Sequence, residues 1–253
     1  MRPYILAETN WQAIKNQKFE LAVLPWGATE AHNYHMPYSS DNIETEAIAA
    51  ESARLAWDNG GKVIVLPTIP VGVNTGQRDI YLDLNFTPST QLAILSDIID
   101  VLNFQKIYKL LIVNGHGGND FRSLIRELGI KYPEMFFGIC NWYQVLDKKL
   151  YFENQGDHAD EMETSLLLYL RPDLVLPLDK WGEGIEKKNK IRGFREGWAW
   201  TERKWSVITE DTGIGNPYLA TAEKGKKYFN DLTLKISGLL EDLCKTDIKN
   251  LYE

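Results

Sequence analysis

Four short apolar segments constrain the fold of this chain more than any other feature. Each is rich in large apolar residues without polar alternation, which is typical of strands buried on both faces of a sheet. They are residues 21–24, 62–66, 109–113 and 135–140. Stretches with helical spacing lie between them, at residues 41–57, 88–102 and 121–128. This alternation predicts an α/β fold, a three-layer α/β/α arrangement with a mainly parallel sheet covered by helices on both faces.

The remaining elements are predicted with less regular patterns. The 253 residues can build one large core, and we expect a single domain over residues 1–253. A short leading helix, a helix before Pro172 and a long final helix are expected at residues 9–14, 165–170 and 217–243. Residues 67–87 have no period, and their length and aromatic residues predict either an ordered loop that lines a site or a peripheral strand.

Composition excludes several classes of protein. The net charge of −7 argues against an extended nucleic-acid-binding face. Cys140 and Cys244 are the only cysteines and form no disulfide framework, which fits a reducing compartment. Acidic Glu8 interrupts the N-terminal stretch, and no apolar run approaches the ~20 residues needed to cross a bilayer. We therefore expect a soluble, cytoplasmic protein without a membrane or nucleic-acid partner.

The first polar cluster follows the strand at 21–24 and contains Glu30, His32, His35 and Asp41. Carboxylates and imidazoles are ligands of divalent metals, and residues at i and i+2 of an extended segment point to one side. Asp41 lies near the start of the next helix, which it or the following asparagine can cap. Its two oxygens could also bridge two ions, whereas the alternative is a polar loop that only caps a helix.

The second cluster is the glycine-rich turn Asn114-Gly115-His116-Gly117-Gly118-Asn119, which follows the strand at 109–113. Glycines allow the backbone to approach a ligand closely. The alternatives are a phosphate-binding turn or a simple tight connection. The turn lacks both the Gly-Lys-Ser/Thr ending of a P-loop and the dinucleotide fingerprint.

The third cluster, residues 157–163, combines His158 with four carboxylates before a helix. Capping and the helix dipole account for one or two acids, but not for the whole set. Since ligands gather beyond the carboxyl ends of parallel strands, we expect the three clusters to share one site. Two divalent ions there would activate a bridging water, and a nearby histidine would protonate a leaving nitrogen, which predicts hydrolysis of an amide or another C–N bond.

Residues 181–205 mix lysines and arginines with five aromatic residues. Such a mixture can bind nucleic acid, but four glutamates dilute its charge. A subunit contact or a flap over the site is therefore the stronger expectation.

The segment Leu24–Pro37 resembles the Pro-x-Gly-x-x-Glu-x-His-x-x-His-x-Pro signature of the creatininase (creatinine amidohydrolase) family. Residues 114–119, 158–165 and 219–225 are similar to its later motifs, in order. The resemblance implies an α/β/α fold, two zinc, manganese or iron ions per chain, and hydrolysis of C–N bonds in small-molecule amides. It also implies a homo-oligomer, often a hexamer.

The resemblance further assigns roles to residues. It implies that Glu30, His32, Asp41 and His116 bind metal, with Asp41 bridging, and that His158 is a catalytic proton shuttle. Creatinine-hydrolysing members have a glutamate at the position of Gly118, so another residue must complete the second metal site. We expect Glu161 there, with Glu163 as the second choice or as a supporting group in catalysis. The residues expected to bind substrate are His35, Gly117, Gly118, Asn119 and Trp142.

The expected function is a metal-dependent amidohydrolase acting on a cyclic amide, a formamide or a short peptide. Gly118 and a divergent loop at residues 72–90 argue against creatinine itself. Relatives act as deformylases or trim peptides in cofactor maturation, so a peptidase-type member is one alternative. A metal-binding, non-catalytic subunit is the other.

Overall fold

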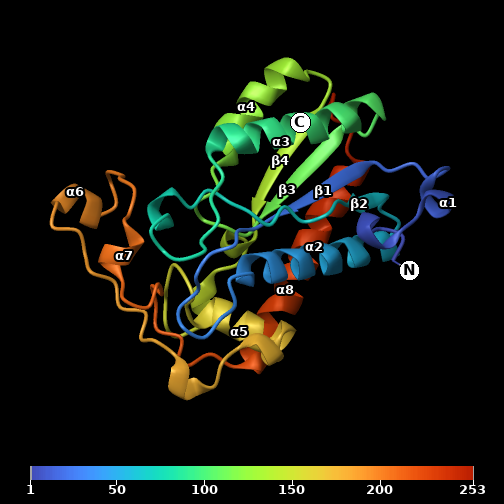
Figure 1. The fold of residues 1–253 in the computed structure, drawn as a ribbon. Coiled ribbons are helices and arrows are strands. Elements are labelled where there is room, and N and C mark those ends of the chain that lie inside the picture. The colour runs from blue at the N-terminus through green and yellow to red at the C-terminus, as the bar shows by residue number, and fades with distance from the viewer. Residues whose placement is uncertain (1, 253) are drawn as a thin grey trace.

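A sheet of four parallel strands forms the centre of the protein (Figure 1). The computed structural model describes residues 2–252. The strands are β1 (Leu21–Trp26), β2 (Val63–Val65), β3 (Lys109–Asn114) and β4 (Phe136–Asn141), in the order β2-β1-β3-β4. Val23 of β1 pairs with Val65 on one side and with Leu111 on the other, which fixes the register of the central strand.

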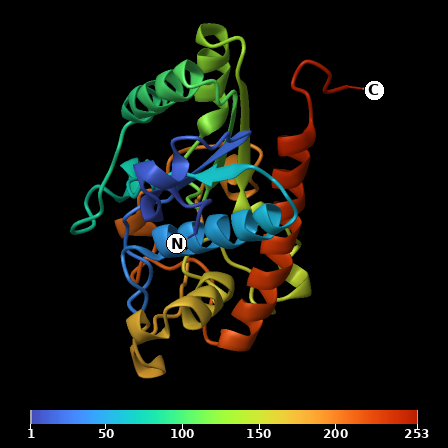
Figure 2. The same ribbon diagram turned by 90° about the vertical axis from the view of Figure 1, so that its right-hand side faces the viewer.

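Alternate residues of β1 face two separate cores. Leu21 and Val23 pack with α2 (Ser40–Asp58), α5 (Glu161–Leu170) and α8 (Ala222–Lys245). The intervening residues Ala22, Leu24 and Trp26 pack with α3 (Pro88–Phe104) and α4 (Phe121–Lys131) on the opposite face. Figures 1 and 2 show these two helical layers on either side of the sheet. The predicted three-layer α/β/α fold is confirmed, since β1, β2 and β3 are buried between two apolar helical layers and β4 is partly buried.

Two helices begin at positions that differ from the predicted boundaries. Helix α2 begins at Ser40, so Asp41 lies inside its first turn rather than capping it. Helix α8 begins at Ala222 rather than Pro217, because the Thr221 side chain accepts a hydrogen bond from the backbone of Lys224 and caps the helix there. The short helices are α1 (Trp11–Ile14), α6 (Arg192–Arg195) and α7 (Trp205–Ile208). Within residues 2–252, no helix has the length and apolar character required to span a bilayer.

The strand order reverses direction between β1 and β3. The chain moves outward from β1 to β2 and then crosses over to β3 on the other side of β1. In open parallel sheets, the loops that follow two such strands separate and leave a binding site between them. Here these loops carry the first two polar clusters.

The segment of residues 183–201, which includes α6, extends away from the layered body in Figure 1. Trp198 and Trp200 are exposed on it, and Arg192 pairs with Glu196 on its helix. The segment then returns to the body at α7, which packs against the turn η2 (Thr75–Gln77).

Candidate metal centre

Six buried side chains from the three polar clusters meet beyond the carboxyl ends of β1 and β3. They form three overlapping groups of potential metal ligands, whose ligand atoms lie within 4.8 Å of one another. The groups are Glu30/Asp41/His116, His32/Asp41/Glu163 and Glu30/His32/His158. Each group combines nitrogen and carboxylate oxygen ligands, the donor set of zinc and similar divalent ions.

Asp41 belongs to two of these groups and offers a different oxygen to each. Its Oδ1 lies 2.8 Å from Nε2 of His32, and its Oδ2 lies 3.1 Å from Nδ1 of His116. The same His116 nitrogen lies 2.8 Å from Oε1 of Glu30. Because Asp41 sits in the first turn of α2, its side chain is free to reach between the loops. A carboxylate in this position can bridge two ions.

Backbone carbonyls fix the orientation of all three histidine rings. His32 approaches the carbonyl of Glu30 with Nδ1 at 3.1 Å, and His116 approaches that of Val73 with Nε2 at 3.1 Å. His158 approaches the carbonyl of Ala31 with Nε2 at 2.9 Å. A carbonyl only accepts hydrogen bonds, so in each neutral ring the nitrogen that faces the carboxylates carries a lone pair. This arrangement is the usual way in which proteins orient metal-binding histidines.

The buried carboxylates of the centre favour a nearby positive charge. Within residues 2–252, Oε1 of Glu30 and Oδ2 of Asp41 are buried without a hydrogen-bond donor. Burial opposes the charged form of His32, but Asp41 outweighs this effect and raises the pKa of His32 to about 10. Burial likewise opposes the charged form of His116, yet Glu30 and Asp41 raise its pKa well above the usual value. Bound cations would supply the same compensation, so the donor set fits divalent metal ions.

Glu163, rather than Glu161, faces this centre. Glu163 completes the group with His32 and Asp41, and its carboxylate accepts a hydrogen bond from the backbone of Ala159. Burial raises the pKa of Glu163 to about 8. Glu161 is fully buried elsewhere, where its carboxylate binds the Lys224 ammonium at 2.5 Å and the Asn154 backbone N–H at 2.7 Å. Glu163, the second choice of the sequence analysis, therefore lies beside the candidate metal site, whereas Glu161 faces Lys224.

The environment of Gly118 explains why no ligand comes from that position. A Cβ atom on Gly118 would lie 2.2 Å from the carbonyl oxygen of Val73 and 2.5 Å from Nε2 of His116. The chain around Val73 therefore occupies the space that a side chain would need. The same Val73 carbonyl orients His116, so the loop position that orients this histidine also requires a residue without a side chain at position 118.

Gln77 is a site residue that the sequence patterns did not reveal. It is buried, and its side-chain amide donates a hydrogen bond to Oε2 of Glu30. It lies within the aperiodic segment 67–87, whose predicted ordered, site-lining character agrees with this contact. No motif distinguishes Gln77 from its neighbours in the sequence.

Three of the five residues expected to bind substrate are engaged elsewhere. Trp142 is wholly buried in the core and its indole N–H donates to Thr45 at 3.1 Å, so the structure does not support a substrate contact. His35 binds Thr164 and stacks on Trp181 with ring centroids 4.5 Å apart.

The glycine-rich turn contains the other three of these residues. The Asn119 carbonyl oxygen accepts hydrogen bonds from the backbone of Val73 and from Gln91, so this side chain holds the loop in place. Gly117 and Gly118 are exposed, and only Gly117 has open space around the position of a Cβ atom. Gly117 remains the residue of this set with room for a ligand beside it.

Backbone strain lies next to two of the clustered histidines. Asn33 follows His32 with φ of 54°, and Ala159 follows His158 with φ of 51°. An alanine in the left-handed region is uncommon and costs of order 1 kcal/mol or more. Such strain persists where surrounding contacts over-determine the backbone, which here holds the two histidines in the cluster.

A further group of buried polar atoms lies behind Glu163. In the described part of the chain, both carboxylate oxygens of Glu44 and the hydroxyl of Tyr228 lack hydrogen-bond partners. Burial, reinforced by the charge of Glu163, raises the pKa of Glu44 well above its usual value. Lys148 is the nearby cation, with its Nζ 3.7 Å from Oδ2 of Asp160.

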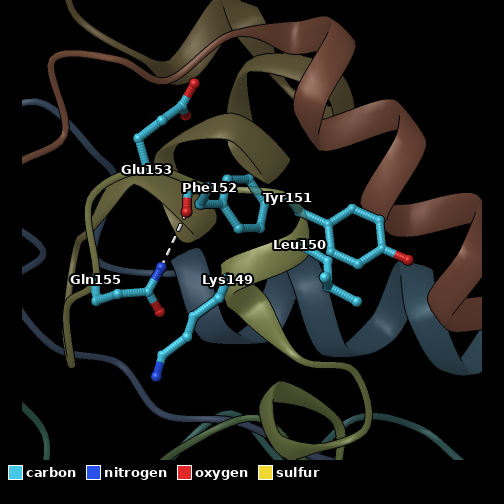
Figure 3. Close-up of a pocket in the computed structure, with 6 residues that line it drawn as sticks. All are labelled: Lys149, Leu150, Tyr151, Phe152, Glu153 and Gln155. Atoms are coloured by element: carbon cyan, nitrogen blue, oxygen red, sulfur yellow. Dashed lines mark hydrogen bonds between the residues drawn. The ribbon is translucent and has the colours of Figure 1, made fainter.

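A cavity of about 600 Å³ opens on the surface beside the Glu161–Lys224 pair (Figure 3). Tyr151 at its wall is directed towards α8, where its hydroxyl donates to Asp231 at 2.9 Å. Glu153 at its edge shares the Lys224 ammonium with Glu161. The lining residues are Lys149, Leu150, Tyr151, Phe152, Glu153 and Gln155, none of which belongs to the three ligand groups.

Comparison with known proteins extends the likeness of the motifs to nearly the whole chain. The family model "Creatininase: Creatinine amidohydrolase" matches residues 7–240. A crystal structure from Bacteroides fragilis NCTC 9343, provisionally described as a creatinine amidohydrolase, is 40% identical over 100% of both chains, with a TM-score of 0.93.

Two more distant proteins are also similar to this chain: a solved structure with the same fold, and a relative described as a peptidase. A creatininase mutant of the Zn–Zn type has 19% identity and a TM-score of 0.80, covering 96% of this chain and 99% of that chain. The mycofactocin precursor peptide peptidase of Mycobacterium ulcerans (strain Agy99) is 24% identical over 222 residues, which are 83% of this chain and 80% of that protein.

Proposed function

Because the chain belongs to the creatininase family, we propose that it is a metal-dependent hydrolase that cleaves a C–N bond of a small amide or a short peptide. The observation that carries this proposal is the convergence of three lone-pair-bearing imidazole nitrogens on the carboxylates of Glu30, Asp41 and Glu163. A purely structural cluster would pair such nitrogens with hydrogen-bond donors.

The ligand sets suggest two ions that share Asp41. Glu30, Asp41 and His116 would hold one ion, and His32, Asp41 and Glu163 would hold the other. When bound, such ions would polarise a substrate carbonyl and lower the pKa of a bound water. The zinc named for the distant creatininase structure makes zinc the first metal to test, followed by manganese and iron.

His158 is the residue best placed to move a proton. Its Nε2 is held by the Ala31 carbonyl, so Nδ1 is the free nitrogen, 3.9 Å from Oε1 of Glu30. Burial lowers the pKa of His158, so its neutral form can accept a proton at Nδ1 and deliver it to the leaving nitrogen. The third ligand group also contains His158, which therefore lies close enough to act on an ion-bound substrate.

A peptide bond fits the proposed chemistry, because its carbonyl and leaving nitrogen match those of other amides. The similarity to a peptidase that acts on a precursor peptide supports this substrate class. The exclusion of a side chain at Gly118 removes the glutamate of creatinine-hydrolysing relatives, which favours a substrate other than creatinine.

Metal analysis tests the proposal directly. Purified protein should contain about two transition-metal ions per chain. Removing them with a chelator should abolish turnover across a panel of formamides, cyclic amides and short peptides, and adding zinc or manganese should restore it. A folded protein that takes up no transition metal would contradict the proposal.

A pair of matched variants separates the two glutamates of α5. Glu163→Gln should lower the metal content from about two ions to about one, because it weakens a carboxylate ligand. Glu161→Gln should keep the metal content and instead lower the melting temperature, because it removes the buried carboxylate partner of Lys224. Elemental analysis and thermal unfolding of both proteins give the comparison. Metal loss in Glu161→Gln alone would reverse our assignment.

A further inference from the structure

The imidazole of His158 is held between two aromatic rings. On one side is His32, with ring centroids 4.2 Å apart and an interplanar angle of 41°. Trp205 contacts the His158 ring edge-to-face, with ring centroids 4.8 Å apart and an interplanar angle of 68°. Only 8% of Trp205 is exposed, although it follows the projecting segment whose other tryptophans are open to solvent. Its contact with His158 is therefore distinct from the environment of Trp198 and Trp200.

A cation–π contact to this indole is anchored by an ion pair. The Arg203 guanidinium stacks over the Trp205 ring at 4.8 Å. The same guanidinium pairs at 2.6 Å with Asp157, the residue immediately before His158. A cation over an indole face contributes about 0.5–2 kcal/mol, depending on its desolvation. Arg203 thus ties Trp205 to the loop that carries the histidine.

The segment of residues 202–206 is also bound to the loop that supports the metal ligands. Ser206 donates to Asp79 at 2.6 Å, and Glu202 accepts a hydrogen bond from Thr75. Gln77, between these two positions, donates to Glu30. One loop therefore contacts both the Trp205 segment and a proposed metal ligand.

We propose that Trp205 is a positioning residue, which holds the His158 ring with Nδ1 towards the metal centre. Nothing in the proposed reaction requires the indole to exchange a proton, so it acts through His158. The Ala31 hydrogen bond fixes which nitrogen of His158 faces the carboxylates, but it allows the ring to turn about the N–O direction. The edge contact of Trp205, together with the ring of His32, restricts this rotation. The inference rests on the proposed function for its kinetic consequence, but the contact itself can be tested without turnover.

The kinetic test compares Trp205→Ala and Trp205→Phe with Trp200→Ala, an exposed tryptophan of the same segment. A displacement of about 1 Å at a catalytic group can cost on the order of 10²-fold in rate. Trp205→Ala should therefore lower kcat about 10²-fold, while KM changes by less than about threefold and zinc content stays constant. Trp205→Phe should restore most of kcat, and Trp200→Ala should behave like the wild type.

The spectroscopic test uses zinc-loaded protein, whose four histidines give few ring signals. Nuclear Overhauser contacts should connect the His158 ring protons to the indole of Trp205, and to the phenyl ring in Trp205→Phe. If Trp205→Ala does not fold, Arg203→Gln replaces it, and should weaken these contacts and lower kcat with unchanged zinc content. An undiminished kcat in a folded Trp205→Ala protein, or absent contacts in the wild type, would overturn the inference. Absence of amide turnover in the wild type, with the contacts present, would instead count against the proposed function.

Discussion

Asp41→Asn is expected to eliminate metal-dependent turnover, with a loss on the order of 10³-fold or more, since bound ions contribute several kcal/mol to the transition state. The reason is that Asp41 offers Oδ1 beside His32 and Oδ2 beside His116, so one substitution would weaken both proposed ion sites. Elemental analysis should show fewer ions per chain, and kinetics with zinc-supplemented protein should show no recovery.

The matched control is Asp120→Asn. Asp120 caps α4 from an exposed position just after the glycine-rich turn, and asparagine is an equally good cap. This variant should retain wild-type metal content and turnover. If Asp41→Asn also retained two ions and full activity, the shared-carboxylate arrangement would be wrong.

Lys224→Met is expected to destabilise the protein by about 3 kcal/mol, the lower end of the range for breaking a buried ion pair, because the lysine is partly exposed. Its removal leaves the fully buried Glu161 carboxylate without its cation. Methionine keeps the apolar stem of the side chain, so packing is nearly conserved. Equilibrium unfolding in urea measures the change in the free energy of unfolding.

Two further variants assign the cause of that loss. Lys226→Met alters an exposed lysine of the same helix and should change stability by less than about 0.5 kcal/mol. The double variant Lys224→Met/Glu161→Gln should regain part of the lost stability, because it no longer buries an uncompensated charge. A loss in Lys226→Met equal to that in Lys224→Met would show that the effect is not specific to the pair.

The sheet and its layers were predictable because each strand alternates between two apolar cores. This pattern is local, because successive strand residues such as Val23 and Leu24 point to opposite faces of the sheet and are both apolar. Helix starts were less predictable where two different start signals occur close together, as the proline at 217 and the capping threonine at 221 do before α8. The choice depended on which side chain could reach a free backbone N–H.

The loops that follow the strands pointed to the candidate ligands. They did not indicate which side chains contact one another in the folded protein. Glu161 and Glu163 lie two positions apart on α5, so they project from different sides of the helix. Only the packing of α5 against α2 and α8 decides which one turns to His32 and which one to Lys224. Trp205 and Gln77 come from segments without periodicity, where no pattern specifies which residue points inward.

The carbonyl contacts of the three histidines have an evolutionary consequence. Every chain position supplies a carbonyl, so exchanges of side chains at 31 or 73 can leave the aim of the rings untouched. Insertion or deletion of one residue in either loop would shift the acceptor itself and misdirect an imidazole. We therefore expect related sequences to vary in residue type around these two loops, whereas the lengths of the loops should stay constant.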